Sequence, residues 1–387
     1  LAKAGLNPYL VTMANIRDQC SWVHMQQYEE ATEKAKDLVR MAVGRITFAR
    51  PLTRQKISVV KEALVIGGGM AGITAALEMA AMGYKTYLVE RSNKLGGNAA
   101  NLAISPSGRY YGPYIQKYID DVLNNPLIEV FVNTEVEKID GYVGNFTTEL
   151  KVGNESRTIR HGVVIVATGA KERKPTEYLY GQSGNIITQM ELESYMLNGK
   201  LDVSNIKNVV MIQCVGSRDE ERPYCSRVCC NQAIKNAMII KQMNEDINVT
   251  ILYRDIRSYG LNETGYRRAR KAGVQFIHYE PESKPVVELR DEKLYVKAYE
   301  PIVDSVIAIQ SDLLVLSAGI ECQADENRKL AQMLKVPLNQ EGFFLEAHAK
   351  LRPVDFATEG VYLCGLAHAP KNMKESIAQA KAAAARA

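Results

Sequence analysis

The stretch "ALVIGGGMAGITAALEMAAMGYKTYLVE", Ala63–Glu90, reads as a strand, a glycine-rich turn, a helix and a second strand. Its turn has the spacing Gly-x-Gly-x-x-Gly. The first glycine allows a tight turn, the second lets the backbone approach a pyrophosphate, and the third lets the helix pack on the strand. The start of the helix presents free N–H groups to the phosphates. We therefore predict a dinucleotide site, in preference to a purely structural turn, on Gly67, Gly69, Met70, Ala71 and Gly72.

An acidic residue and three further motifs indicate which dinucleotide binds. Glu90 ends the second strand, at the place where an acid bonds the ribose hydroxyls. The loop "RSNKLGGNAA" (91–100), the strand end "VVIVATGA" (163–170) and "GVYLCGLAHAP" (360–370) follow in that order. Together they resemble the signatures of two-dinucleotide-binding flavoproteins of the thioredoxin reductase type, although each alone is unspecific. The resemblance implies FAD, contacted also by Glu90, Arg91, Gly96, Gly97, Asn98, Ala167, Thr168, Gly169, Gly365, Leu366, Lys371 and Ile377.

The third of these motifs departs from the usual flavoprotein pattern. Thioredoxin-reductase-like proteins usually have Gly-Asp there, with the acid bonding the ribityl chain, whereas Gly365 is followed by Leu366, so the ribityl contacts must differ. Lys371 lies near the start of the last helix, whose N-terminal end should face the flavin. Two interpretations stay open. Lys371 bonds flavin N5 or offsets the charge of reduced flavin, which makes it the catalytic candidate, or it is a solvated surface lysine.

Length and composition indicate an ordinary globular protein of two or three domains. The chain has 387 residues, 46% hydrophobic and 24% charged, and its net charge of +4 gives no reason to expect nucleic-acid binding. No apolar run is long enough to span a membrane, and no signal peptide is recognisable. Seven cysteines, four of them clustered, indicate a reducing compartment, the cytoplasm, and metal or redox chemistry. Because the chain starts at Leu1, we expect it to be a piece of a longer polypeptide.

A second βαβ-like unit begins with the strand "NVVMIQ" (208–213), but no glycine fingerprint follows it. The stretch "CVGSRDEERPYCSRVCC" (214–230) holds four thiols there instead. Four thiolates suit a zinc ion or an iron–sulfur cluster, and an unmetallated dithiol loop is the third alternative. The adjacent pair at its end favours [4Fe–4S], because neighbouring side chains reach one small tetrahedral ion with difficulty. The predicted ligands are Cys214, Cys225, Cys229 and Cys230, and the interleaved Arg218, Arg222 and Arg227 either offset the charge of the cluster or form a solvated loop face.

This cysteine stretch resembles the signature of HdrA, the iron–sulfur flavoprotein component of heterodisulfide reductase in methanogens and related anaerobes. "LNPYLVTMANIRDQCSWVH" (6–24), "GYVGNF" (141–146) and "GLAHAPKNMKESIAQAKAAAA" (365–385) are similar to the same family, so the resemblance covers nearly the whole chain. The family's ferredoxin-like Cys-x-x-Cys-x-x-Cys segments and its N-terminal domain have no counterpart in this sequence. The resemblance is therefore to the flavin core of HdrA, or to a shortened relative of it.

The resemblance implies an oxidoreductase that passes electrons between FAD and clusters within a large cytoplasmic complex. In methanogens the family is assigned flavin-based electron bifurcation between the heterodisulfide CoM-S-S-CoB and ferredoxin. Its implied partners are other heterodisulfide reductase subunits, hydrogenase or formate dehydrogenase subunits, ferredoxin and a second copy of the chain. Two rival functions remain: an NAD(P)H-dependent flavin disulfide reductase, disfavoured by the missing second glycine motif, and a non-catalytic assembly protein clipped by zinc.

We expect an α/β fold with two interleaved nucleotide-binding-type domains and antiparallel hairpins. The expected parts are an N-terminal helical and linker segment 1–61, an FAD domain formed by 62–195 and 306–387, and an inserted cluster-carrying module 196–305. Cys322 and Cys364 are expected to be buried structural thiols. Cys20 is either a packed thiol or, by the resemblance, a cluster ligand shared with a domain outside this sequence.

Overall fold

The computed structural model describes residues 2–105 and 108–387, which divide into two compact units. The first unit ends at Ser58 and is helical, as its helix-forming residues at helical spacing predict. The second unit, Val59–Ala387, contains both of the predicted nucleotide-binding-type modules. The helices of the first unit are a 3-10 turn (Ala2–Ala4), a π-helical turn (Arg17–Ser21) and α1 (Tyr28–Thr47).

Cys20 is packed within the first unit. Its side chain is 1% exposed, and its Sγ donates a hydrogen bond to Ala31 O at 2.8 Å. This placement agrees with the interpretation of Cys20 as a small packed thiol.

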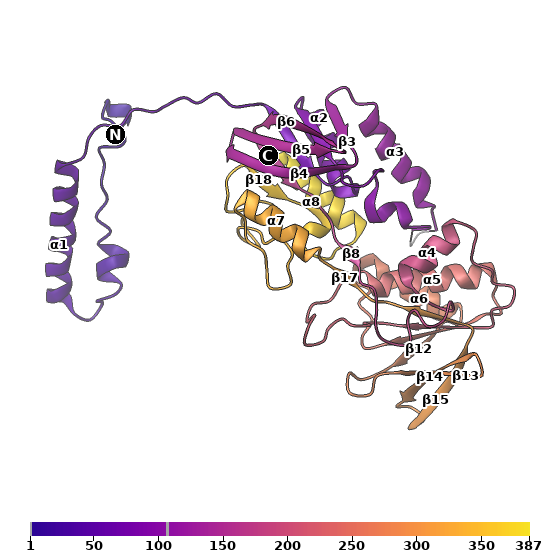
Figure 1. Cartoon of the computed structure of the whole chain (residues 1–387). Helices are drawn as coiled ribbons and strands as arrows, with labels where there is room; N and C mark the ends of the chain where they lie inside the picture. The colour runs from indigo at the N-terminus through magenta and orange to yellow at the C-terminus, as the bar shows by residue number, and fades with distance from the viewer. Residues whose placement is uncertain (1, 106–107) are drawn as a thin grey trace. The chain divides into compact units, whose positions relative to one another are not determined.

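The first parallel sheet of the second unit has the strand order β18-β7-β1-β2-β3. Figure 1 labels its two outer strands, β18 and β3. Its strands are nearly continuous apolar runs, as is typical of parallel strands that are buried on both faces. One face packs against α2, α3 and α8, and the other against the antiparallel sheet β4-β5-β6. The bounds are β1 Glu62–Ile66, α2 Met70–Ala81, β2 Lys85–Val89, α3 Tyr111–Leu123, β3 Ile128–Phe131, β4 Thr134–Tyr142, β5 Asn145–Val152, β6 Glu155–His161, β7 Val163–Val166, β18 Val361–Leu363 and α8 Met373–Arg386.

The second parallel sheet repeats the plan with the strand order β12-β11-β10-β16-β9. Helices α4, α5 and α6 cover one face, and the antiparallel sheet β13-β14-β15 covers the other. The expectation of two similar nucleotide-binding-type domains, each interrupted by antiparallel hairpins, is confirmed. The bounds are β9 Ile186–Thr188, α4 Gln189–Leu197, β10 Asn208–Ile212, α5 Cys229–Met243, β11 Asn248–Tyr253, α6 Glu263–Lys271, β12 Gln275–His278, β13 Val286–Arg290, β14 Lys293–Glu300, β15 Ser305–Ser311 and β16 Leu313–Leu316.

The second module is larger than the sequence predicts. The expected bounds 196–305 leave out β9 and β16, which pair in parallel within its sheet. The chain instead crosses between the modules at the short antiparallel pair β8 (Lys171–Glu172) and β17 (Ile320–Glu321). A sequence pattern identifies a strand but not the sheet that it joins, because that depends on pairing with distant residues.

One further helix, α7 (Ala324–Leu334), follows β17 and packs against the first module. Within residues 2–105 and 108–387, no helix combines the length and the apolar character that crossing a bilayer requires.

Candidate functional site

In the glycine turn between β1 and α2, other backbone atoms lie close to two of the glycines, whereas the third has free space beside its Cα. Gly67 has φ +113°, and a Cβ added there would lie 2.3 Å from Ala167 O. A Cβ added at Gly72 would lie 1.8 Å from Gly67 O. A Cβ added at Gly69 would meet nothing closer than the Cα of Gly97, at 3.9 Å. The protein's own packing thus requires the first and third glycines, whereas the second leaves room for a ligand to approach the backbone.

The predicted ribose acid and the Leu-Gly-Gly loop both lie against this turn. Glu90 accepts hydrogen bonds from Gly68 N at 2.6 Å and from Ser92 N at 2.8 Å. Gly96 N donates to Gly68 O at 2.8 Å, and Gly97 lies beside Gly69. The structure therefore brings these parts of the predicted dinucleotide site together.

Two residues flanking that loop have partners elsewhere in the first module. The Asn98 side chain donates to Ala170 O at 2.8 Å, which ties the loop to the end of β7. The Arg91 guanidinium pairs with Glu326 of α7 and with Gln323, the residue before that helix. Arg91 is thus held by protein partners, and its predicted contact with a cofactor stays a prediction.

The ends of β7 and β18 complete the same edge of the first sheet. The hydroxyl of Thr168 is buried and has no hydrogen-bond partner among the described residues. Gly365 has φ +69°, and a Cβ added there would lie 2.6 Å from the Cβ of Ala71. Leu366 follows in a 3-10 turn (Gly365–Ala367). A buried hydroxyl without a partner is costly, so Thr168 Oγ1 marks a position where a bound group would supply the missing hydrogen bond.

Lys371 is buried rather than solvated, so the interpretation of it as a surface lysine is wrong. Its side chain is 9% exposed, and its Nζ donates to Gly365 O at 2.7 Å and to Ala369 O at 2.8 Å. Burial, followed by the nearby Arg227 charge, lowers the pKa of Lys371 to about 8. The ammonium group thus remains protonated at neutral pH, with one hydrogen left for an acceptor after its two bonds to carbonyls.

Helix α8 starts directly after Lys371 and lies beside the start of α2. Asn372 is its N-cap and forms a capping box with Glu375. Met373 and the predicted contact residue Ile377 pack against the cluster that contains Met70 and Ala99. The N-terminal ends of α2 and α8 therefore meet at the same place, where their dipoles both favour negative charge.

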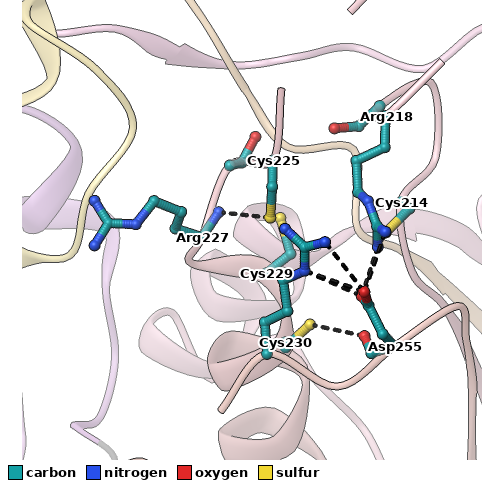
Figure 2. Close-up of a pocket in the computed structure, with 10 residues that line it drawn as sticks. Cys214, Arg218, Cys225, Arg227, Cys229, Cys230 and Asp255 are labelled. Atoms are coloured by element: carbon teal, nitrogen blue, oxygen red, sulfur yellow. Dashed lines mark hydrogen bonds and ion pairs between the residues drawn. The ribbon is translucent and has the colours of Figure 1, made fainter. Parts of the chain in front are cut away.

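The four predicted cysteine ligands line a single pocket at the corresponding end of the second sheet (Figure 2). Cys214 follows β10, Cys229 and Cys230 open α5, and Cys225 lies in the loop between them. Across the described ranges, no three His, Cys, Asp or Glu side chains stand close enough to hold one metal ion. The thiols thus share a pocket without forming the compact ligand set of a single zinc ion.

The loop that carries these cysteines has an unusual backbone. Cys214, Gly216, Arg218 and Arg227 have φ of +57°, +53°, +60° and +62°. Several N–H groups of this loop donate to backbone carbonyls, as Val215 N does to Ser317 O at 3.1 Å and Arg218 N to Arg222 O at 2.7 Å. Arg227 N instead donates to Cys225 Sγ at 3.3 Å. The backbone thus offers a hydrogen bond to sulfur at Cys225.

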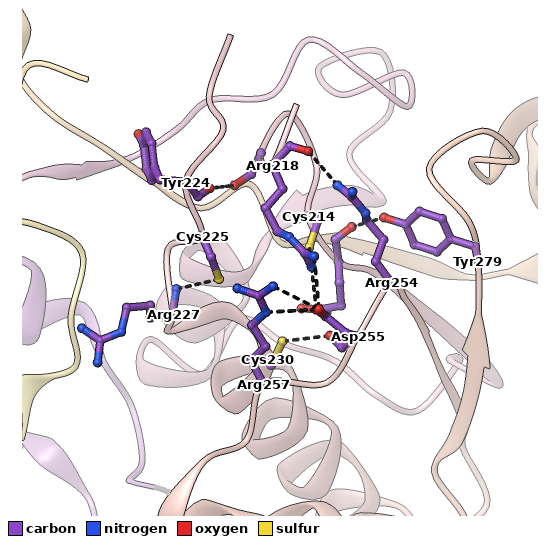
Figure 3. Close-up of polar contacts among 12 residues, drawn as sticks. Cys214, Arg218, Tyr224, Cys225, Arg227, Cys230, Arg254, Asp255, Arg257 and Tyr279 are labelled. Carbon is purple, nitrogen blue, oxygen red and sulfur yellow. Dashed lines mark hydrogen bonds and ion pairs between the residues drawn. The ribbon is translucent and has the colours of Figure 1, made fainter. Parts of the chain in front are cut away.

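Basic side chains surround the pocket, and they are balanced by one aspartate (Figure 3). Arg218 donates to both oxygens of Asp255, at 2.5 and 3.1 Å, and lies 3.8 Å from Cys214 Sγ. Arg257 donates to the same carboxylate at 3.1 to 3.2 Å. Arg222 is directed to Gly216 O at 2.6 Å and does not line the pocket. Two of the three predicted arginines, Arg218 and Arg227, thus reach the pocket.

Burial disfavours the thiolate form of three of the four pocket cysteines. Burial raises the pKa of Cys230 to about 11 and that of Cys229 well above its ordinary value. Burial also raises the pKa of Cys214, against the opposing effect of Arg218. Metal or cluster ligation requires thiolates, so filling the pocket would release protons.

Comparison with known proteins identifies the family. The family model described as pyridine nucleotide-disulphide oxidoreductase matches residues 61–210. The A subunit of H(2):CoB-CoM heterodisulfide,ferredoxin reductase of Methanothermobacter thermautotrophicus is 36% identical, over 100% of this chain and 72% of its own length. An iron-sulfur A subunit of CoB–CoM heterodisulfide reductase of Methanopyrus kandleri is 35% identical, over 100% of this chain and 73% of its own. The chain belongs to the HdrA family of heterodisulfide reductases.

Solved structures similar to this HdrA family member include thioredoxin reductases. That of T. acidophilum has a TM-score of 0.57 at 17% identity and covers 84% of this chain and 96% of its own. That of Lactococcus lactis has a TM-score of 0.58 at 18% identity, with coverage of 84% and 97%. The predicted two-dinucleotide-binding flavoprotein fold is confirmed, and the family membership makes the chain an oxidoreductase.

Sequence reasoning missed Asp255 and Arg257, which line the cysteine pocket of this HdrA family member. Both follow β11, the parallel neighbour of β10, so their side chains arrive at the same edge of the sheet. The convergence of parallel strand ends could have located them. Of the two remaining cysteines, Cys364 is buried as predicted, whereas Cys322 is only half-buried and donates to Glu341 O at 2.9 Å.

Proposed function

We propose that this protein is a cytoplasmic electron-transfer subunit that holds one FAD in its first module and one [4Fe–4S] cluster in its cysteine pocket. The proposal rests on one observation above all. The same end of two similar parallel sheets carries an open glycine turn in one module and four thiols in the other. FAD supplies the exchange between two-electron and one-electron steps, and the cluster supplies one-electron transfer.

The residues of the first module fit FAD. The open backbone at Gly69 and the start of α2 suit the pyrophosphate, and Glu90 lies where a ribose would be bound. The unpartnered hydroxyl of Thr168 and the buried ammonium of Lys371 lie at the strand and helix ends proposed to surround the flavin. Lys371 would hold positive charge against reduced, anionic flavin.

The cysteine pocket fits a cubane cluster better than a single ion. A cluster has four separated iron corners, so its thiolates need not converge on one point. The N–H group of Arg227 and the guanidinium of Arg218 would stabilise the negative charge of a thiolate-bound cluster. The expected ligands are Cys214, Cys225, Cys229 and Cys230.

The proposed setting is a heterodisulfide reductase-type complex that includes a second copy of this chain. One relative is named for hydrogen, the CoB–CoM heterodisulfide and ferredoxin, and the relative in Methanococcus maripaludis for hydrogen or formate. We accordingly propose hydrogenase or formate dehydrogenase subunits as donors, and electron bifurcation towards CoM-S-S-CoB and ferredoxin as the reaction served.

Anaerobic isolation of the chain, with metal, sulfide and flavin analysis, tests the cofactors. We expect about one FAD, and about four iron and four sulfide per cubane. Cys225→Ser should lose iron and sulfide, whereas Cys322→Ser, which changes another half-buried thiol outside the pocket, should keep them. Zinc without acid-labile sulfide would refute the cluster and support the alternative of an assembly protein. Flavin bands without cluster absorption would support the flavin disulfide reductase.

A further inference from the structure

Residues 224–227 run from the cysteine pocket to the FAD-type module. The Tyr224 hydroxyl donates to Ile320 O at 3.0 Å, and its ring packs edge-on against Phe343 at 5.7 Å. The hydroxyl of Ser226 accepts from Ile320 N at 2.8 Å. The residues on both sides of Cys225 therefore contact β17, and Tyr224 also contacts Phe343. Cys214 instead follows β10, and Cys229 and Cys230 begin α5. Of the four thiols, Cys225 is the one whose neighbours in sequence bond to the crossing strand β17 and contact Phe343.

Arg227 extends this connection to α8. Its backbone N–H donates to Cys225 Sγ at 3.3 Å, and its guanidinium donates to Glu375 Oε1 at 2.6 Å. The Tyr259 hydroxyl donates to the same oxygen at 3.1 Å, and the guanidinium lies 5.6 Å from the centre of the Tyr259 ring. One residue thus contacts a thiol of the pocket with its backbone and the last helix with its side chain.

Glu375 is the residue that orders the start of α8. Its other oxygen, Oε2, accepts from Asn372 N at 3.0 Å, and Glu375 N donates to Asn372 Oδ1 at 2.9 Å. This capping box follows Lys371 directly and lies beside Met70 of the glycine turn through Met373. One oxygen of the Glu375 carboxylate therefore accepts a hydrogen bond at the N-terminal end of α8, and the other accepts one from the cysteine loop.

We propose that Arg227 is a positioning residue that couples the two cofactor sites. Through Glu375 it holds the first turn of α8 against the loop that carries Cys225, so that an ordered cysteine pocket strengthens FAD binding. Binding linkage is reciprocal, so FAD in turn favours the ordered pocket. The identity of the two cofactors rests on the proposed function, whereas the mechanical connection rests on the contacts of Arg227 and Glu375.

Two substitutions and one matched control isolate this connection. Arg227→Gln removes the guanidinium, and Glu375→Gln removes the carboxylate charge while keeping a side chain that is competent for the capping box. Arg257→Gln is the control, because Arg257 lines the same pocket with the same side-chain exposure, 44%, but pairs with Asp255 instead of α8. All three are made in the full chain, together with the double variant R227Q/E375Q.

Hydrogen exchange at the amides of Glu375 and Ser376 is measured first, because it needs neither cofactor. Both amides are hydrogen-bonded to Asn372. Their exchange should accelerate in Arg227→Gln and Glu375→Gln but not in Arg257→Gln. The FAD dissociation constant, from fluorescence titration, should rise about two- to five-fold in the first two variants, as expected for a partly exposed ion pair. The double variant should resemble either single one.

Equal amide exchange at Glu375 and Ser376 in Arg227→Gln and Arg257→Gln would overturn the proposal, as would additive effects of the two substitutions in the double variant. Iron and sulfide content is determined on the same samples. Absence of iron and sulfide would contradict the proposed function. The exchange rates of the Glu375 and Ser376 amides would still decide whether Arg227 positions α8.

Discussion

At Gly69 the backbone faces open space, whereas at Gly67 and Gly72 it touches other backbone atoms. An added Cβ would have its nearest neighbour at 3.9 Å at Gly69, but at 2.3 Å and 1.8 Å at the other two. The three glycines of the motif are therefore needed for different reasons. Gly67 and Gly72 are needed for the packing of the fold, and Gly69 is needed for a ligand to approach the turn.

This difference separates binding from stability by substitution. Gly69→Ala should keep the melting temperature of the FAD-free chain and weaken FAD binding by about tenfold or more, because the new methyl group occupies the approach path. In contrast to Gly69→Ala, Gly72→Ala should lower the melting temperature, because the added Cβ overlaps Gly67 O. Thermal unfolding and fluorescence titration measure the two effects. Unchanged FAD affinity in Gly69→Ala would place the dinucleotide elsewhere.

Glu172, where β8 crosses between the modules, predicts a pH dependence of stability. Burial raises its pKa to about 7 from 4.5, although the hydrogen bonds from Thr188 and Met190 N oppose the shift. Between these values the unfolded chain has lost the proton that the folded chain still binds, so the free energy of unfolding falls as pH rises. Glu172→Gln stays neutral and should be more stable than the parent by up to about 3 kcal/mol above pH 7, with no advantage near pH 4. Denaturant unfolding at several pH values checks this, and parallel pH profiles for the two chains would contradict it.

At the scale of elements, α8 brings a buried charge to the place proposed for the flavin. Lys371→Ala should lower the flavin midpoint potential by about 30 mV or more, equivalent to about 1.4 kcal/mol for a two-electron couple. The difference should shrink as pH rises through 8, where Lys371 loses its proton. Lys374→Ala is the control, because Lys374 is exposed on the first turn of the same helix. Spectroelectrochemical titration measures the potentials, and equal values for the two variants would leave Lys371 with only its bonds to Gly365 O and Ala369 O.

The cysteine loop has some features that local sequence predicts and others that it does not. Four thiols between a strand pattern and a helix pattern predict that Cys214, Cys229 and Cys230 share one sheet edge, and the structure places them there. The left-handed backbone at Cys214, Arg218 and Arg227 has no such local pattern, because non-glycine residues rarely adopt it. Contacts from Asp255 and from Ile320 of β17 hold the loop in this conformation.

At the scale of the whole molecule, the two modules present different surfaces at equivalent strand ends. The turn after β1 is open at Gly69, whereas after β10 a Cβ at Gly216 would lie 2.2 Å from the Arg173 guanidinium. Arg254, a conceivable phosphate ligand, donates to Arg218 O instead. The second module therefore has no open backbone turn at this position for a second dinucleotide.

From this contrast we expect that neither NADH nor NADPH reduces the isolated chain efficiently. The pyrophosphate of a nicotinamide dinucleotide needs free N–H groups and close backbone approach, and Arg173 and the cysteine loop fill that position. Anaerobic stopped-flow mixing with each nucleotide, followed at the flavin band, makes the test, with dithionite as the positive control for reducible flavin. Rapid, saturable bleaching by either nucleotide would favour the flavin disulfide reductase.

The sequence alone determined the two βαβ units, the glycine turn beside Glu90 and the grouping of four cysteines. These features depend on residues that are close along the chain, where spacing and periodicity act directly on the backbone. Only the tertiary structure decided that β9 and β16 join the second sheet, that Lys371 is buried, and that Arg227 pairs with Glu375. Those features depend on contacts between residues far apart in the chain. Their formation is governed by the packing of whole sheets and helices, which no local pattern encodes.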